Sequence, residues 1–228
     1  MLRALVVLLS ALVALSSLGP PTIRMSSAIL GGTVHHVVVA GDTVRSLSAR
    51  FGVGEAVIAE DNALSSTRRL VVGQILHLDT RHIVPPESTA TRLVVNVPQR
   101  HVFLAPVDRG VIAYPIAVGR PDWRTPLGLF TIIEREVDPV WDVPVSLQNE
   151  MRRRGQEVTT TVPPGPDNPL GRFFIRLSFS GVALHGTTAP GSIYQSVTHG
   201  CIRLHPDDIA DLFERVEVGT SGESVYEP

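Results

Sequence analysis

The chain has 228 residues, a formal net charge of −2 and 18% charged residues. This balance argues against a nucleic-acid-binding protein, which would need a strong excess of basic residues. Aromatic residues make up only 5% of the sequence, so aliphatic side chains must build the core.

The N-terminus is typical of a secretory signal peptide. Arg3 is followed by an apolar run over residues 4–18 and then by helix-breaking residues at 19–21. The run is shorter than the roughly 20 residues that span a bilayer, so we expect cleavage rather than a retained anchor. We expect residues 1–28 to be the signal segment, with the cut falling between positions 16 and 28. The remaining length suits one mid-sized domain and a small one.

A small α+β unit is predicted over residues 35–80. Val37-Val38-Val39 is typical of a strand, and a turn that can cap a helix follows it. Apolar residues then recur at helical spacing as far as Gly52, which ends the helix. A second short helix is expected over 54–61 and a strand over 75–78. So small a unit buries a modest core and suits binding better than catalysis.

A polar connector with two adjacent prolines is expected over residues 81–90. The second unit then spans 91–228 and is predicted to consist mostly of strands, beginning with a hairpin. The stretch 138–170 is long, polar and rich in proline, as is typical of a functional lid or binding loop. Strands are expected over 93–97, 101–105, 111–118, 129–133, 173–177 and 182–184.

A C-terminal helix is predicted from Pro206 onward. Proline suits the first helical position, and Asp207 and Asp208 are favoured there by the helix dipole. An apolar stripe then packs the helix on the sheet. The stripe consists of Ile209, Leu212, Phe213 and Val216.

Cys201 is the only cysteine of the chain. Exported proteins usually pair their cysteines, and an unpaired thiol in an oxidising compartment risks oxidation. One interpretation is that Cys201 is a small buried apolar side chain that takes no part in a reaction. The alternative is a nucleophile, because His185 and His199 are near in sequence and an imidazole can remove a thiol proton.

The first unit resembles the LysM module at Gly41-Asp42-Thr43, Phe51-Gly52-Val53, Asp61-Asn62 and Val72-Gly73-Gln74. The resemblance implies a βααβ fold that binds N-acetylglucosamine-containing glycan strands of peptidoglycan or chitin in a shallow groove. A spacer of the same shape that binds no glycan is the alternative. The implied groove residues are Gly41, Asp42, Thr43, Val72 and Gly73.

The second unit resembles the YkuD-type L,D-transpeptidases in four motifs that occur in order. These are residues 125–130 (Thr-Pro-Leu-Gly-Leu-Phe), residues 163–171, His185-Gly186 and residues 198–203 (Thr-His-Gly-Cys-Ile-Arg). The family usually has serine where Thr198 stands, which preserves the hydroxyl. The resemblance implies a mainly-β catalytic domain, so the whole chain is expected to hold two domains, the second with a C-terminal helix.

The resemblance also implies a reaction. Cys201 would attack the third-residue carbonyl of a peptidoglycan tetrapeptide stem, release D-alanine and pass the acyl group to an amine, with His185 as the base. No metal or cofactor is expected. The residues expected to orient the base or stabilise the oxyanion are Gly186, His199 and Gly200. The residues expected to contact the substrate are Thr198 and Arg203.

Several outcomes remain open at the level of sequence. The acceptor can be a stem amine, a lysine of an outer-membrane lipoprotein, a free D-amino acid or water, and water would make the protein an L,D-carboxypeptidase. A zinc peptidase using His199, Cys201 and His205 is a rival enzyme hypothesis. The third hypothesis is a wall-binding protein without enzymatic activity. Each reading expects an exported protein in the periplasm or cell wall, with no nucleic-acid partner.

Overall fold

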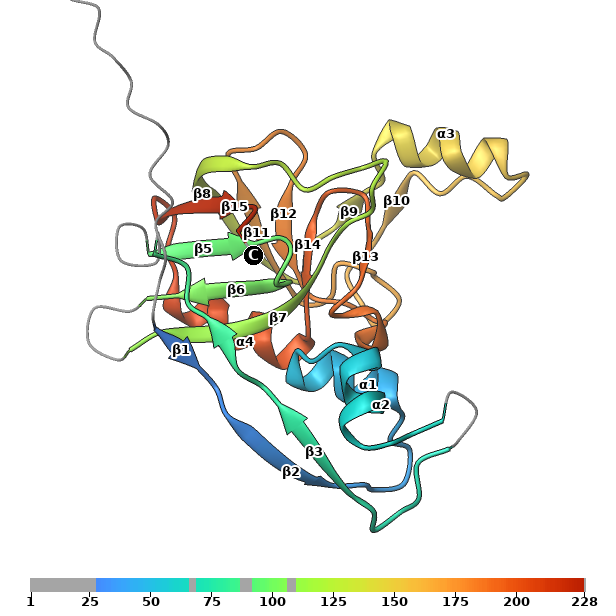
Figure 1. Ribbon diagram of the computed structural model, residues 1–228. Helices are drawn as coiled ribbons and strands as arrows, with labels where there is room; N and C mark the ends of the chain where they lie inside the picture. Colours follow the sequence, from blue (N-terminus) through green and yellow to red (C-terminus); the bar gives the residue numbers. More distant parts are fainter. Residues whose placement is uncertain (1–27, 66–68, 87–91, 106–109, 228) are drawn as a thin grey trace, which may run out of the picture.

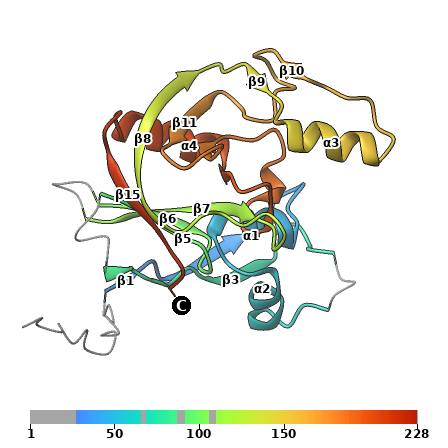
Figure 2. The same ribbon diagram turned by 90° about the horizontal axis from the view of Figure 1, so that it is seen from above.

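The computed structural model describes residues 28–65, 69–86, 92–105 and 110–227. The first unit lies beside the larger second unit, and the two are in contact (Figures 1 and 2). The predicted signal segment lies almost entirely outside the described residues. Within the part of the chain that is described, no helix is long and apolar enough to cross a membrane.

The first unit has the order strand, helix, helix, strand. The strands β2 (Thr33–Val37) and β3 (Ile75–Asp79) pair antiparallel, and the helices α1 (Val44–Phe51) and α2 (Glu55–Asp61) lie between them in the chain. Both helices were predicted, the first from its apolar spacing and the second as a short helix over 54–61. Gly52 ends α1 with a left-handed φ of 65°, a conformation that glycine adopts without strain.

The first strand is displaced from its predicted position. It ends at Val37, because Val38 exchanges backbone hydrogen bonds with the loop before β3: its N–H donates to Gln74 O at 2.8 Å, and its C=O accepts from Gly73 N at 2.8 Å. Val38 is buried in the small core of this unit. The core also contains Leu47, Val53, Ile58, Leu76 and Leu78.

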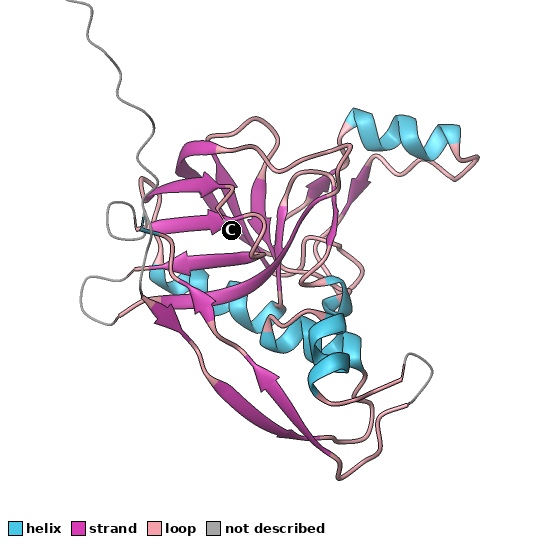
Figure 3. Ribbon diagram, viewed as in Figure 1, coloured by secondary structure: helices cyan, strands magenta, loops and turns pink. Residues whose placement is uncertain are grey.

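The second unit is a nine-stranded sheet in the order β13-β7-β14-β12-β11-β8-β15-β5-β6. Because β6 also pairs with β7, the sheet closes on itself as a barrel (Figure 3). Its strands are β5 (Leu93–Asn96), β6 (His101–Leu104), β7 (Ile112–Gly119), β8 (Gly128–Val137), β11 (Phe173–Leu177), β12 (Ala183–His185), β13 (Ser196–Thr198), β14 (Ile202–Leu204) and β15 (Ser221–Val225).

The predicted helix at Pro206 is α4 (Pro206–Arg215), and its apolar stripe joins the barrel core. The helix is not the last element, however. Strand β15 follows it and pairs with β5 and β8. Its sequence Ser-Gly-Glu-Ser-Val has little strand propensity. Glycine is required at 222, where a Cβ would lie 2.4 Å from the Phe130 ring.

The prediction of a loop over 138–170 is wrong in part. This segment, here called the insert, contains a pair of short strands, β9 (Trp141–Asp142) and β10 (Thr161–Val162), and the helix α3 (Val145–Arg153). Helix α3 projects beside the barrel (Figures 1 and 2). No periodic pattern predicted this helix, because Glu150 is its only buried residue and it therefore lacks an apolar stripe.

The two units share a packed interface. Ala49 of α1 forms a buried cluster with Ala117 of β7 and Ile193, which follows the 3₁₀ turn η2 (Pro190–Ser192). Within the predicted connector, β4 (His82–Ile83) pairs with β1 (Ile29–Leu30). The small side chains of Ala49 and Ala117 allow the two units to approach closely. The pairing of β4 with β1 gives the described part of the connector a regular structure.

Candidate active site

His185 ends strand β12, and Cys201 immediately precedes the neighbouring parallel strand β14. Strands β12 and β14 pair with Leu184 opposite Ile202 and His185 opposite Arg203. Leu184 and Ile202 are fully buried in the barrel core. Because side chains alternate along a strand, His185, Arg203 and Cys201, the residue just before β14, face the other side.

That other side opens on a cavity of about 470 Å³. The barrel and its loops supply one wall, which includes both the thiol and the imidazole. The insert supplies the opposite wall with Trp141, Pro144, Ser146, Leu147, Pro169 and Leu170. The lid prediction is therefore consistent with the position of the insert, although its helix was not foreseen.

The imidazole of His185 has a defined tautomer. Its Nδ1 lies 2.7 Å from Gly186 O. A carbonyl only accepts hydrogen bonds, so Nδ1 carries the proton and Nε2 presents a lone pair. The side chain is 5% exposed, and burial lowers the pKa of His185 to about 4, with the charge of Arg203 acting in the same direction. At neutral pH the ring is therefore an uncharged proton acceptor.

The Cys201 thiol is protonated at rest. Burial raises its pKa, against the smaller opposing effects of the Ala183 N–H and the Arg203 charge. Its Sγ donates to Gly181 O at 3.6 Å, and among the described residues no hydrogen bond joins it to His185. The thiol and the base share the cavity without being paired, so activation requires proton transfer as the thiol reacts.

Two buried threonines hold the turn that ends at Cys201. Thr198 Oγ1 donates to Cys201 O at 2.5 Å, and Thr125 Oγ1 donates to Gly200 O at 3.0 Å. Gly200 has φ of 101°, which explains the requirement for glycine. The hydroxyl of Thr198 thus donates its proton to the backbone, while the residue also lines the cavity, so its substrate contact stays a prediction. Thr125 lies in a recognised motif, but its role was not predicted.

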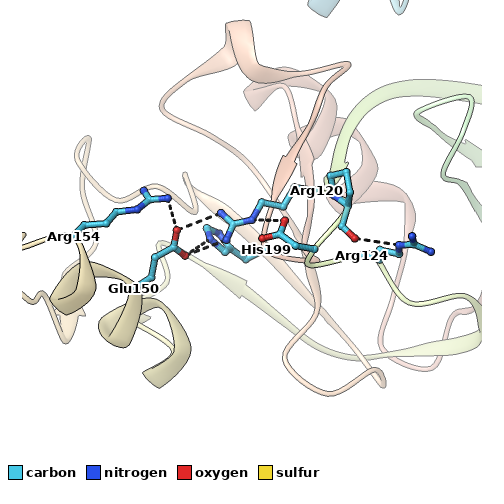
Figure 4. Close-up of polar contacts among 7 residues, drawn as sticks. Arg120, Arg124, Glu150, Arg154 and His199 are labelled. Carbon is cyan, nitrogen blue, oxygen red and sulfur yellow. Dashed lines mark hydrogen bonds and ion pairs between the residues drawn. The ribbon is translucent and has the colours of Figure 1, made fainter.

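The side chain of His199 points toward the insert. Its Nε2 lies 3.0 Å from Glu150 Oε2 (Figure 4). Its ring packs edge-to-face with that of Trp123, with the ring centroids 4.4 Å apart. The base is oriented by the Gly186 carbonyl instead, so a base-orienting role for the His199 side chain is not supported. Glu150 carried no recognisable signal in the sequence.

Arg203 is anchored at one end only. Its Nη1 donates to Ser192 Oγ at 2.9 Å, whereas its buried Nε has no hydrogen-bond partner among the described residues. The guanidinium also lines the cavity. Arg203 therefore borders the space that holds the thiol and the imidazole.

The structure brings the predicted glycan-binding loops together, because Val38 bonds to both Gly73 and Gln74. Two of the polar side chains already have partners. The Asp42 carboxylate accepts from Val39 N at 2.8 Å and lies 2.7 Å from the His36 ring, and Thr43 caps α1. What this face offers is backbone and exposed apolar surface, formed by Val39, Val71, Val72 and Ile75.

The three predicted zinc ligands do not converge. His199 is engaged with Glu150, and His205 Nδ1 accepts from Asp207 N at 3.3 Å at the start of α4. Over the described ranges, no group of three His, Cys, Asp or Glu side chains could hold a metal ion. The zinc-peptidase hypothesis therefore has no support in this geometry.

Comparisons with known proteins agree with both resemblances. Residues 90–226 match the YkuD family model, the L,D-transpeptidase catalytic domain, and residues 36–79 match the LysM domain model. "Probable L,D-transpeptidase ErfK/SrfK" of Escherichia coli (strain K12) is 31% identical over 187 residues, covering 81% of this chain and 60% of that protein.

Its namesake in Salmonella typhimurium (strain LT2) is 33% identical over 212 residues, covering 89% of this chain and 66% of that protein. YkuD of Bacillus subtilis (strain 168) is 28% identical over 183 residues, covering 80% of this chain and 93% of that protein. The chain therefore spans less than two thirds of the length of the two enterobacterial relatives.

Proposed function

The protein is a member of the YkuD L,D-transpeptidase family, and from that premise we propose that it is an exported cysteine acyltransferase of peptidoglycan. The observation that carries the proposal is the shared cavity. It holds the chain's only thiol, just before β14, and a neutral imidazole at the end of the neighbouring strand β12, with room for a peptide.

The first half of the reaction forms a thioester. As the Cys201 sulfur attacks the carbonyl carbon of the third stem residue, His185 Nε2 takes the thiol proton. The bond to D-alanine then breaks, and the imidazolium returns that proton to the departing amine. The lowered pKa of His185 keeps the ring neutral, and so free to accept a proton, before attack. It also makes the imidazolium a ready acid toward the departing amine.

The oxyanion is stabilised by the backbone N–H groups of Gly200 and Cys201. A trans peptide directs its C=O and N–H in opposite directions, so the bond from Thr125 to Gly200 O fixes the N–H of Cys201. Each such fixed donor contributes roughly 3 kcal/mol to the transition state. Thr125 is therefore a positioning residue for the oxyanion site, and Thr198 holds the next peptide of the same turn through Cys201 O.

Arg203 binds a carboxylate of the donor stem. The place of Arg203 in the cavity wall supports this, and charged hydrogen bonds of guanidinium to carboxylate are strong and directional. The alternative of an ion pair that only holds the loop lacks an acidic partner within the described part of the chain. Ser192 supplies the neutral anchor that leaves the charge available.

The thioester keeps the free energy of the broken amide, so a new amide can form without ATP. An amine of a second stem, a lipoprotein lysine or a D-amino acid completes a transfer, whereas water completes a carboxypeptidase reaction. The LysM unit holds the enzyme on its polymer and raises the effective concentration of stems. Its exposed apolar face and the backbone of Gly41, Val72 and Gly73 form the glycan contact.

The test is incubation of the purified protein with a muropeptide tetrapeptide and assignment of the products by mass spectrometry. We expect release of D-alanine together with a crosslinked, exchanged or shortened stem, the products identifying the acceptor. The activity should survive a metal chelator and disappear in Cys201→Ala. Absence of D-alanine release under all acceptor conditions would favour a wall-binding protein without activity.

A further inference from the structure

Helix α3 of the insert is fastened to the second unit by a carboxylate. Glu150 is the only buried residue of this helix and is 8% exposed. No residue of α3 belongs to the hydrophobic clusters formed by the described residues. The position of α3 therefore depends on the polar contacts of Glu150 rather than on apolar packing.

Three cationic or polar side chains meet at this carboxylate (Figure 4). Arg120 Nη2 lies 3.2 Å from Oε2, Arg154 Nη2 lies 2.5 Å from Oε1, and His199 Nε2 lies 3.0 Å from Oε2. The Glu150 side chain is 11% exposed, against 61% for Arg154. The pKa of Glu150 lies below its ordinary value, mainly because Arg120 donates hydrogen bonds to the carboxylate. The carboxylate is therefore ionised at neutral pH.

The partners of Glu150 join the insert to the segments that flank Cys201. Arg120 follows β7, and its backbone N–H donates to Thr198 O at 3.0 Å. His199 is two residues before the cysteine. The guanidinium of Arg120 also lies 5.2 Å from the ring centroid of Trp123, which lines the cavity. One carboxylate thus ties three separate segments around the cavity.

The same face of α3 lines the cavity. Ser146 and Leu147 precede Glu150 by four and three residues, so all three share one face of the helix. Ser146 and Leu147 belong to the cavity wall opposite Cys201. Any movement of α3 that follows loss of the Glu150 contacts displaces that wall.

We propose that Glu150 is a positioning residue that sets the donor-peptide site by holding α3 of the insert against Arg120 and His199. The inference rests on the proposed acyl-transfer function and extends it to donor recognition. Glu150 does not touch the reacting atoms. It determines whether the insert wall is in place to bind the stem that Cys201 attacks.

The experiment compares Glu150→Gln with the wild-type protein containing both units. Glutamine keeps the shape but removes the negative charge, so the helix loses its ion pairs with Arg120 and Arg154. We expect KM for the tetrapeptide to rise about tenfold, with kcat changed by less than about threefold. Alkylation of Cys201 by iodoacetamide, which needs no contact with α3, should proceed at the wild-type rate.

Two further variants separate positioning from general damage. Glu157→Gln removes an exposed carboxylate of the same insert and should leave KM unchanged. Glu150→Asp keeps the charge and should recover part of the loss. Wild-type KM in Glu150→Gln, with D-alanine release intact, would overturn this inference alone. Failure of the wild-type protein to release D-alanine would overturn the proposed function and this inference with it.

Discussion

Two buried histidines of this chain look alike until their surroundings are compared. His185 and His101 are 5% and 2% exposed, and burial is the main reason that their pKa values fall to about 4 and about 3. His101 lies between the two units, with its ring centroid 3.9 Å from that of His82. His185 instead opens on a cavity that also holds a thiol.

The comparison teaches that a depressed pKa marks burial and becomes a mark of function only beside a cavity and a reactive partner. His185 is assigned to chemistry, and His101 to the contact between the units. Their substitutions should therefore have separable effects.

The largest effect is expected for His185→Gln. Without a proton acceptor, kcat/KM for D-alanine release should fall about a thousandfold. The matched substitution His101→Gln should leave kcat within about threefold of wild type, because that ring faces no substrate. Steady-state kinetics of both variants test this contrast. An equal loss of kcat/KM in the two variants would contradict the different roles assigned to the two histidines.

The next effect concerns the interface. A Cβ at Gly52 would lie 2.4 Å from His101 Nε2, and the position has φ of 65°. We expect Gly52→Ala to lower the free energy of unfolding by about 3 kcal/mol, from overpacking added to backbone strain. Gly41→Ala is the control, since it has φ of 96° with nothing within 4 Å of the added Cβ.

Denaturant titration compares these two variants. A smaller loss, about 1 kcal/mol, is expected for Gly41→Ala. If both variants lost the same free energy, His101 would not be tightly packed against α1.

A third effect is the pH dependence of stability. Folding lowers the pKa of His101 and of His185. At a pH below the ordinary histidine pKa of about 6.5, the unfolded state therefore binds more protons than the folded state. Stability should therefore fall as the pH drops from 7 toward 4, by on the order of 3 kcal/mol for each ring. His101→Gln and His185→Gln should each flatten this dependence, as measured by unfolding at several pH values. An unchanged slope in both would contradict the assigned burial.

The smallest effect is expected for Ser192→Ala. Arg203 Nη1 loses its anchor, so the guanidinium is held less firmly for the donor carboxylate. KM should rise about threefold with kcat preserved, since the charge itself remains. Ser196→Ala, which changes an exposed serine of β13, is the control. An unaltered KM would argue that Arg203 does not depend on η2.

The sequence predicted the features that are encoded locally. The helix α1, ended at Gly52, and the helix α4, begun by Pro206, follow from the types and spacing of neighbouring residues. The motifs around His185 and Cys201 likewise pointed to residues that share one cavity. Short-range patterns are sufficient for such features.

Features that depend on distant partners were missed. The role of Glu150 could not be predicted from its polar helix, because it depends on contacts with Arg120 and His199, which are distant in the sequence. The turn-holding role of Thr125 depends on Gly200, and strand β15 depends on its pairing with β5 and β8. The contact of His101 with His82 is also a product of the fold. No local pattern records these pairings.

Intact-protein mass spectrometry of the acid-quenched reaction with a tetrapeptide tests the central claim most directly. The account predicts a mass increase equal to the tripeptide acyl group, located on Cys201, lost in Cys201→Ala and formed far more slowly in His185→Gln. D-alanine release that continues in Cys201→Ala, with no covalent adduct on the wild-type protein, would contradict it.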